Sequence, residues 1–424
     1  MALQRQLART DFFLEQPFTM LHSVARASAL TARHNARFIA LRPSRAAMSV
    51  CKPQPWTTSL CISRRQQLAL QHTERQLNAS EAAIPPSESE TPAPAPYKPP
   101  TTGLLSKLPA SWVPYAELIR LDKPAGTYYL FFPCMFSTLL AAPMATPMAS
   151  IGTVVGTGAL FFSGALIMRG AGCIINDLWD RNLDPHVART RLRPIARGAV
   201  TPFKGLVFTG TQLLAGLAIL LQFPYECLFY GIPSLLLVAS YPLAKRVTYY
   251  PQFVLGLTFS WGAFMGFPAL GVDLLTNQAA LTSAACLYTS NIAWTVLYDM
   301  IYAHMDIRDD AKAGIKSIAL KHDAQTKQWL TGLALTQVSL LAAAGAAAGA
   351  GPLFYIGSCG GALATLGIMI KRVKLKDPKD CWWWFVNGCW ITGGVVSTGL
   401  AADYLVRLNN SDEESTSADV VSSS

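Results

Sequence analysis

The chain has 424 residues, of which 51% are hydrophobic and only 14% are charged, and its mean hydropathy is +0.29. Soluble proteins average about 25% charged residues, so this composition excludes an ordinary soluble enzyme and indicates that most of the chain faces lipid. The net charge of +10 does not indicate nucleic-acid binding, because the basic excess lies almost entirely in the N-terminal arm.

The N-terminal arm, residues 1–79, is rich in arginine and poor in acidic residues. This composition is typical of an organelle transit peptide, and the scarcity of serine relative to arginine favours a mitochondrial destination. The alternative is an arm that is merely disordered. Residues 80–111 are predicted to be a disordered linker, because seven prolines between residues 80 and 102 lie among serine, glutamate and alanine and cannot bury a core.

Long runs without charged residues follow the linker. A helix needs ~20 apolar residues to cross ~30 Å of hydrocarbon, and the runs, divided at their prolines and glycines, supply nine such helices. The runs cover residues 124–168, 205–244, 247–272, 274–298, 328–370 and 381–402, and Glu226 is the single charged residue within them. We therefore predict an all-α integral membrane domain over residues 112–408 with nine transmembrane helices, followed by an acidic disordered tail at 409–424.

The connections between these helices fall into two classes by charge. The segment before the first helix and those after the second, fourth, sixth and eighth contain Lys and Arg, whereas the turns after the first, third, fifth and seventh contain neither. The positive-inside rule places the basic connections on the cytoplasmic-equivalent side, which in a mitochondrion is the matrix. The sequence thus predicts a multi-pass protein of the mitochondrial inner membrane.

An acidic segment directly follows the second predicted helix and contains Asn176, Asp177, Asp180 and Asp184. If the helix continues through this segment, all their oxygens share one broad face. Carboxylates crowded at a membrane boundary repel one another and are costly to desolvate, so we expect a cation to hold them together. The alternative is a solvated loop that happens to be acidic.

A second acidic cluster begins at the end of the sixth predicted helix, on the same side of the membrane. Asp299, Asp306 and Asp310 are spaced to share one helical face, with Tyr302 on it and Asp309 beside it. Two acidic clusters that open on one side can converge on divalent cations. Oxygen ligands in this number suit Mg2+, which also takes the oxygens of a substrate phosphate.

Basic residues near the clusters complete a clamp for a diphosphate. Arg193 follows the first cluster, Tyr241 and Lys245 end the fourth predicted helix, and Lys316 follows the second cluster. Carboxylates, metal and basic side chains together stabilise a departing diphosphate, whose apolar neighbour would be an isoprenoid chain between the helices. Arg193 precedes a proline, so it could equally belong to a structural turn.

These segments resemble the signatures of the UbiA superfamily of intramembrane aromatic prenyltransferases. Residues 176–184, N-D-x-x-D-x-x-x-D, with R-P-x-x-x-G at 193–198, are similar to the first signature. Residues 298–317 resemble the second signature in its 4-hydroxybenzoate polyprenyltransferase branch, and residues 120–126 and 241–245 also fit. The resemblance covers roughly residues 112–405. It implies a fold of nine helices around a central cavity.

The resemblance also implies a reaction, the Mg2+-dependent transfer of a polyprenyl group from its diphosphate to the ring carbon ortho to the hydroxyl of 4-hydroxybenzoate, in ubiquinone biosynthesis. By motif position, it assigns Mg2+ and diphosphate binding to Asn176, Asp177, Asp180, Asp184, Asp306 and Asp310. The catalytic members of this set are Asp180, Asp184, Asp306 and Asp310. Asp177 belongs either to the metal ligands or to the residues that support them.

The remaining candidate residues fall into three groups. Contacts to the diphosphate are expected from Arg193, Tyr241, Lys245 and Lys316. Asp299, Tyr302 and Asp309 are expected to position the metal ligands without binding the metal themselves. The carboxylate of the benzoate has two candidate partners, Arg120 and Arg169.

Two alternatives stay open. Family members that act on haem, homogentisate or a naphthoate share the first signature, and acceptor choice is a property of the cavity. An ion-coupled transporter could also use carboxylates among nine helices, although transporter sites normally lie near the bilayer midplane rather than at helix ends. The expected partners are polyprenyl diphosphate, 4-hydroxybenzoate and the lipid bilayer, with other enzymes of ubiquinone synthesis as candidates and no nucleic acid.

Overall fold

The computed structural model describes residues 97–423 except 187–189 and 308–315, and these residues belong to one compact unit. The predicted transit peptide, the linker up to residue 96, and Asp309 and Asp310 of the second cluster lie outside the described residues. Within the described ranges all regular structure is helical, which confirms the predicted class.

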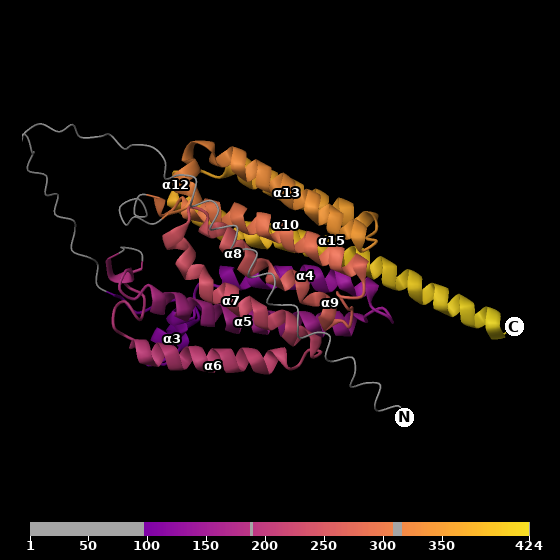
Figure 1. Ribbon diagram of the computed structural model, residues 1–424, viewed down its shortest axis with the longest axis horizontal. Coiled ribbons are helices and arrows are strands. Elements are labelled where there is room, and N and C mark those ends of the chain that lie inside the picture. Colours follow the sequence, from indigo (N-terminus) through magenta and orange to yellow (C-terminus); the bar gives the residue numbers. More distant parts are fainter. Residues whose placement is uncertain (1–96, 187–189, 308–315, 424) are drawn as a thin grey trace, which may run out of the picture. The chain divides into compact units, whose positions relative to one another are not determined.

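The helices run side by side, most of them along one direction (Figure 1). The long ones are α4 (Ala125–Ala141), α5 (Ile151–Trp179), α6 (Pro202–Leu220), α7 (Glu226–Val247), α10 (Gln278–Ala303), α13 (Thr326–Ala347), α14 (Gly361–Arg372) and α15 (Pro378–Ser423). The short ones are η2 (Leu105–Lys107), α3 (Val113–Leu118), η3 (Ala142–Met144), η4 (Asp184–His186), α8 (Pro251–Phe259), η5 (Ser260–Phe264), α9 (Gly266–Ala269), α12 (Ile318–His322), η6 (Asp323–Gln325) and η7 (Phe354–Gly360).

Local sequence signals account for where several of these helices begin and end. Ser150, Thr201 and Asn277 each precede a helix, and their side chains accept a hydrogen bond from a backbone N–H of its first turn. Pro143 and Pro147, at which the run 124–168 was divided into two predicted helices, separate α4 from α5. The glycine and proline residues at 349–352, which divided the run 328–370, follow α13, and Gly349 adopts a positive φ of 66° there.

The predicted count of nine transmembrane helices is not confirmed. Among the described residues, six helical segments are long and apolar enough to cross a membrane, namely Ala125–Met144, Ile151–Trp179, Pro202–Leu220, Ile318–Ala347, Phe354–Arg372 and Pro378–Ser411. The run at 247–272 folds as three short pieces, α8, η5 and α9. α10 has 26 residues, but polar residues such as Ser283, Ser290 and Asn291 lower its mean hydropathy. These polar side chains are buried inside the protein.

α4 and α10 lie in the middle of the unit and share its largest apolar core. α4 packs against α5 and α15, and α10 packs against α8 and α13. Phe136 of α4, Leu297 of α10 and Phe354 beside α14 are almost completely buried in that core. α15 continues to Ser423, so the segment expected to be an unstructured tail is helical in the structure. The C-terminal ends of α5 and α10 lie beside the cavity described next.

Candidate functional site

The first acidic segment spans a helix end rather than one helical face. α5 ends at Trp179, and Asp180 is its C-cap, with the backbone N–H bonded to the carbonyl of Asn176 at 2.9 Å. Asp184 opens the short turn η4 and precedes Pro185, which disfavours helical backbone at the residue before it. The expectation of a continuous helical face is therefore wrong. Asn176 and Asp177 lie on α5, and Asp180 and Asp184 lie in the turn beyond it.

Asp177 is the centre of an ion-pair network and is only 1% exposed. Arg120 Nη2 donates to both of its carboxylate oxygens, at 2.8 and 2.9 Å. Arg193 Nη1 donates to Asp177 Oδ1 at 3.1 Å and to Asp184 Oδ2 at 2.9 Å. Arg193 thus bridges two aspartates of the first signature. A buried carboxylate with two guanidinium partners is held in one position. Because Arg193 also pairs with Asp184, the same network fixes the turn that carries Asp184.

Arg120 reaches Asp177 from a strained backbone position. Its φ of 59° lies in the left-handed region, which a non-glycine residue rarely adopts. Its Nη1 donates to the carbonyls of Glu117 and Leu118 at the end of α3. Burial is the largest single influence and disfavours the charged form of Arg120, but the Asp177 carboxylate and other nearby groups together outweigh it, so the pKa of Arg120 is raised. Arg120 is therefore a permanent cation held against α5.

The second acidic cluster also spans a helix end. α10 ends at Ala303, and buried His304 closes it, with Nδ1 2.8 Å from the carbonyl of Met300. Asp306 lies in the following bend, while Asp299 lies one turn before the helix end. The expected single face from Asp299 through Asp306 is therefore wrong, because the helix stops between them. Both signatures therefore divide their polar residues between the end of a helix and the turn that follows it.

One cavity of about 710 Å³ joins the two signatures. Asn176 and Asp177 of the first signature line it, as does Asp299 of the second. Arg120, Arg169 and Arg193 also line it. The structure therefore brings together residues of both signatures that are more than a hundred positions apart in the sequence.

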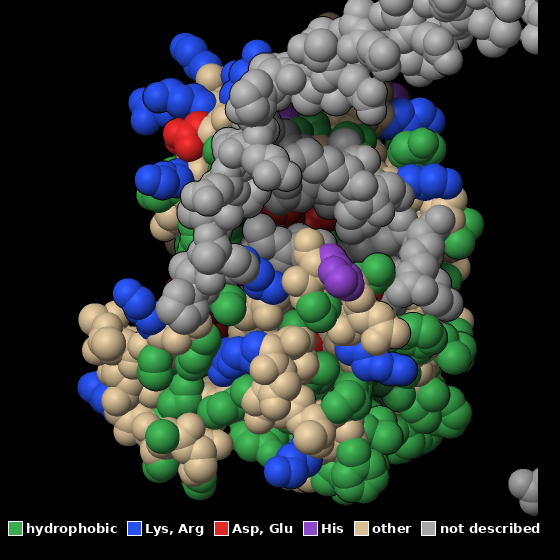
Figure 2. Space-filling model, turned by 90° about the vertical axis from the view of Figure 1, so that its left-hand side faces the viewer, with side chains coloured by type: hydrophobic (Ala, Val, Ile, Leu, Met, Phe, Trp, Pro, Cys, Tyr) green, Lys and Arg blue, Asp and Glu red, His purple; other side chains and the backbone are tan. Residues whose placement is uncertain are grey.

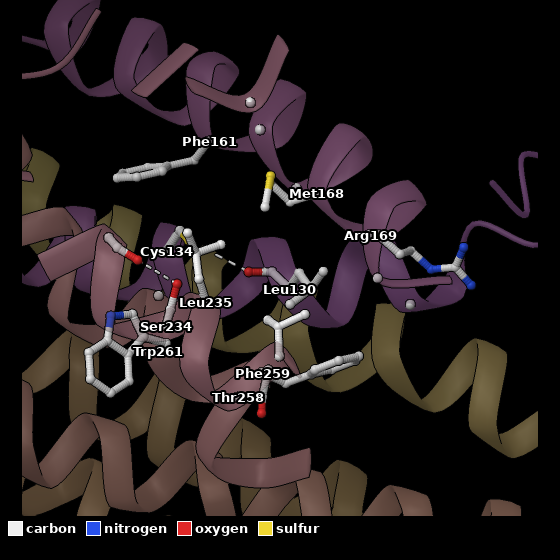
Figure 3. Close-up of a pocket in the computed structure, with 18 of the residues that line it drawn as sticks. Leu130, Cys134, Phe161, Met168, Arg169, Ser234, Leu235, Thr258, Phe259 and Trp261 are labelled. Atoms are coloured by element: carbon white, nitrogen blue, oxygen red, sulfur yellow. Dashed lines mark hydrogen bonds between the residues drawn. The ribbon is translucent and has the colours of Figure 1, made fainter. Parts of the chain in front are cut away.

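The rest of the cavity is apolar and extends between α4, α5, α6, α7 and α8. Arg169 lies towards one end, and Phe161 and Trp261 lie at the other, with Met168 between them (Figure 3). From Asn176 to Phe161, α5 rises by about 22 Å. The cavity thus has a charged mouth and a long apolar interior, which suits a ligand with a charged head and an extended hydrocarbon chain.

Stacked aromatic rings lie behind the mouth of the cavity. The rings of Tyr129 and Tyr298 stack with centroids 3.5 Å apart, and the ring of Phe385 is 5.2 Å from Tyr129. Tyr129 donates a hydrogen bond to the carbonyl of Phe385 at 2.8 Å. Tyr298 and Phe385 line the cavity next to Asp299. The sequence analysis did not identify Tyr129 or Phe385, because their proximity arises only from the packing of α4 and α15 on α10.

The other predicted residues whose side chains are described do not line the cavity, namely Asp180, Asp184, Tyr302, Asp306 and Lys316. Tyr302 packs on Phe385, with ring centroids 4.7 Å apart. The ammonium of Lys316 lies 3.5 Å from the carbonyl of Val247. Tyr241 and Lys245 belong to α7, and their side chains lie outside the described part of the structure.

The donor chemistry fits a hard divalent cation. Amide and carboxylate oxygens of Asn176 and Asp299 face one cavity, and oxygen donors are what Mg2+ prefers. Within the described ranges, no group of three or more His, Cys, Asp or Glu side chains is close enough to form a metal site, and Asp310 lies outside those ranges. Asp177 already has two arginine partners, so it is better placed to support metal ligands than to be one.

Comparison with known proteins agrees with this geometry. Residues 130–392 match the UbiA prenyltransferase family. A protein from Saccharomyces cerevisiae is 46% identical over 306 residues, covering 72% of this chain and 80% of that protein. A protein from Bos taurus is 39% identical over 358 residues, covering 83% of this chain and 91% of that protein. Both carry the name "4-hydroxybenzoate polyprenyltransferase, mitochondrial".

Two solved structures share the fold. A UbiA homolog from Aeropyrum pernix K1 superposes with a TM-score of 0.50 at 20% identity, covering 67% of this chain and 98% of the other. A UbiA homolog from Archaeoglobus fulgidus, bound to DMAPP and Mg2+, also has a TM-score of 0.50, at 15% identity, covering 70% of this chain and 99% of the other. At these identities the likeness shows the fold alone.

Proposed function

The chain belongs to the UbiA prenyltransferase family, and we propose that it transfers a polyprenyl group from polyprenyl diphosphate to the ring carbon ortho to the hydroxyl of 4-hydroxybenzoate, in ubiquinone biosynthesis. The relatives named for this activity support the proposal. The observation that carries it is the cavity, which connects residues of both signatures with a long apolar interior.

At the mouth of the cavity, we assign Mg2+ and diphosphate binding to the two signatures. Mg2+ would be held by Asn176, Asp180, Asp184, Asp306 and Asp310, and when bound it would supply positive charge to the departing diphosphate. The side chains proposed to bind the remaining phosphate oxygens are the basic Arg193, Lys245 and Lys316 and the hydroxyl of Tyr241. Asp177, Asp299, Tyr302 and Asp309 would hold these groups in place.

The chemical step breaks the bond between the allylic carbon and the diphosphate oxygen, and the bonding electrons leave with the diphosphate. The allylic cation is then attacked by the electron-rich ring carbon of the phenol, which afterwards loses its proton to restore the aromatic ring. The rings of Tyr298 and Phe385 at the mouth can stabilise the cation through their π faces. The surrounding helices exclude water, which would otherwise capture the cation.

The apolar interior is proposed to hold the polyprenyl chain, so filling it should shorten the accepted chain. Gly164 of α5 lines the cavity, and a Cβ there would make only ordinary contact with Ile219. Gly164→Leu is expected to lower turnover with long polyprenyl diphosphates at least about fivefold relative to short ones, because its side chain occupies the space of the chain. Gly156→Leu is the matched control, since Gly156 lies on the same helix with nothing within 4 Å. Competition between short and long donors measures the preference, and an unchanged preference in Gly164→Leu would exclude this placement of the chain.

Arg169 is the stronger candidate for the benzoate carboxylate. Its guanidinium packs directly over Gly126, and it lines the cavity with a hydrogen bond to the carbonyl of Ile119 at 3.4 Å and no ion pair to any described residue. Arg120, by contrast, is fully engaged by Asp177. Arg169→Gln is expected to raise KM for 4-hydroxybenzoate about tenfold or more, with KM for the polyprenyl diphosphate little changed, because a charge-assisted contact to one substrate is lost. Steady-state kinetics with each substrate varied in turn checks this, and a rise confined to the diphosphate KM would contradict the assignment.

The experiment that tests the function is mass spectrometry of the product formed by the purified protein. It is offered 4-hydroxybenzoate, homogentisate, a naphthoate and haem separately, each with a ladder of polyprenyl diphosphates. We expect a prenylated product from 4-hydroxybenzoate alone, with the new bond ortho to the hydroxyl. A product formed only from another acceptor would favour that alternative, and ion flux in liposomes without any prenyl transfer would favour a transporter.

The placement in the cell forms part of the proposal. We infer that residues 1–79 direct the protein to the mitochondrial inner membrane, that the helical domain spans residues 112–408, and that α7, α10 and the α8–η5–α9 segment complete nine crossings. The names of the mitochondrial relatives and the Lys and Arg side chains at the end of the molecule seen in Figure 2 support this placement. The cavity mouth would then face the matrix, where other enzymes of ubiquinone synthesis are candidate partners.

A further inference from the structure

Three residues to which no role has been assigned above meet beside α3, and one of them, Arg197, occupies a variable position of the first signature. Glu117 of α3 accepts a hydrogen bond from Arg197 Nη2 at Oε2, at 2.6 Å, and one from the hydroxyl of Tyr97 at Oε1, at 2.8 Å. The guanidinium of Arg197 lies over the ring of Tyr97, 3.7 Å from its centroid. The side chains of Arg197 and Glu117 are only 13% and 16% exposed. We call this set of Tyr97, Glu117 and Arg197 the clasp.

The clasp joins the same two segments that converge on Asp177. Arg197 lies one turn after Arg193, and its backbone N–H bonds to the Arg193 carbonyl at 2.9 Å. Arg120 follows Glu117 by one turn and bonds to the Glu117 carbonyl at 3.0 Å. Two links therefore run between α3 and the turn around residue 195. The inner link is Arg120 to Asp177 to Arg193, and the outer link is the clasp.

We propose that the clasp positions Arg193 for the diphosphate, so that Glu117 and Arg197 set the affinity for the prenyl donor without touching it. This inference rests on the proposed function and adds three residues to the same site. Arg193 has to hold two aspartates and still present its guanidinium at the cavity mouth. A second link one turn away restricts the rotation of that turn, which the inner link alone leaves free.

Direct contact between Arg197 and the diphosphate is the competing explanation. Both terminal nitrogens of Arg197 are already engaged, since Nη1 donates to the carbonyl of Leu192 at 2.6 Å and Nη2 donates to Glu117. Arg197 is also absent from the lining of the described cavity, whereas Arg193 lines it. The geometry therefore assigns Arg197 to positioning.

Loss of the clasp should leave the fold intact. The turn is also held by an apolar cluster in which Ile195 and Val200 pack with Leu118 and Ile174, all of them buried. Burial and the hydrogen bond to Glu117 raise the pKa of Tyr97, so its hydroxyl stays protonated and keeps donating to the carboxylate. The clasp variants should accordingly change the position of Arg193 rather than unfold the domain.

The test uses the full chain and steady-state kinetics with geranylgeranyl diphosphate as the donor. Glu117→Gln and Arg197→Gln are each expected to raise KM for the donor about tenfold, with kcat changed less than about threefold and KM for 4-hydroxybenzoate unchanged. Tyr97→Phe, which removes a single hydroxyl, should raise donor KM less. The matched control is Lys204→Gln, an exposed basic residue at the start of α6, which should leave donor KM unchanged.

The decisive variant exchanges the charges, Glu117→Arg with Arg197→Glu in one chain. Restored donor KM in this double variant, after a rise in both single charge changes, supports positioning by an ion pair. A double variant no better than Arg197→Glu alone overturns the proposal, because Arg197 would then act directly. Lower kcat with unchanged donor KM in every variant also overturns it, because that pattern reports loss of folded protein. Absence of any prenyl transfer by the wild-type chain would instead reject the proposed function.

Discussion

Asp180→Asn and Asp306→Asn are each expected to lower prenyl transfer at least about 100-fold, the size of effect seen when one group that stabilises a developing charge is removed. Asparagine keeps the shape of the side chain and one oxygen, but it loses the negative charge that a divalent cation requires. Asp180 caps α5 and Asp306 lies in the bend after α10. Each change therefore removes one carboxylate from a different signature, and turnover of 4-hydroxybenzoate measures the loss.

Asp273→Asn is the matched control for these two changes. Asp273 lies in the loop between α9 and α10, and it accepts hydrogen bonds from the backbone of Leu275 and the side chain of Thr276. The bond from Leu275 is the main reason that the pKa of Asp273 is lowered, so Asp273 is ionised at neutral pH. Its replacement should leave turnover within about twofold of wild type. Activity retained in Asp180→Asn and in Asp306→Asn would remove both from the diphosphate site.

Asp177→Ala is expected to lower stability more than any other single change at the cavity mouth. Arg120 and Arg193 are only 15% and 19% exposed, and both are paired with Asp177. Removing one partner of a buried ion pair costs about 3–5 kcal/mol, because the remaining charge stays desolvated. The melting temperature of the detergent-solubilised protein should therefore fall clearly. Turnover should fall with it, since Arg193 would lose one of its two aspartate partners.

Asp122→Ala is the control that tests whether the loss of stability in Asp177→Ala comes from the burial of its ion pairs. Asp122 pairs with Lys123 at 3.6 Å, but their side chains are 36% and 58% exposed. Such exposed pairs contribute about 0–1 kcal/mol, so the melting temperature should hardly change. If Asp177→Ala and Asp122→Ala had equal, small effects, the buried network would not be what holds the Arg193 turn in place.

Local signals in the sequence predicted where some of the helices are separated. Prolines at 143 and 147, and the glycine and proline residues between 349 and 352, mark the breaks before α5 and after α13. These signals act through φ restriction and loss of a backbone donor, which depend on few neighbours. The acidic residues of the two signatures also predicted the kind of ligand. This prediction is possible from sequence because the preference of oxygen donors for hard cations does not depend on the fold.

The sequence could not predict which site residues lie on helices, which lie in turns and which contact one another. Whether α5 and α10 extend through their acidic segments depends on capping and on Pro185, and both helices end earlier than the spacing suggested. Arg120 and Asp177 are 57 residues apart, and Tyr129 and Tyr298 are 169 apart, so only tertiary packing brings these pairs together. The clasp could not be predicted for the same reason. Nothing in the sequence around Glu117 indicates that it pairs with Arg197.

The central claim is that both acidic signatures bind one diphosphate through a divalent cation. It is tested most directly by titrating the purified protein with farnesyl thiodiphosphate, a slowly reacting donor analogue, in Mg2+ and in EDTA. We predict binding that requires Mg2+ and that is weakened at least about tenfold in both Asp180→Asn and Asp306→Asn. Equal binding in EDTA, or wild-type affinity in either variant, would contradict a site shared by the two signatures.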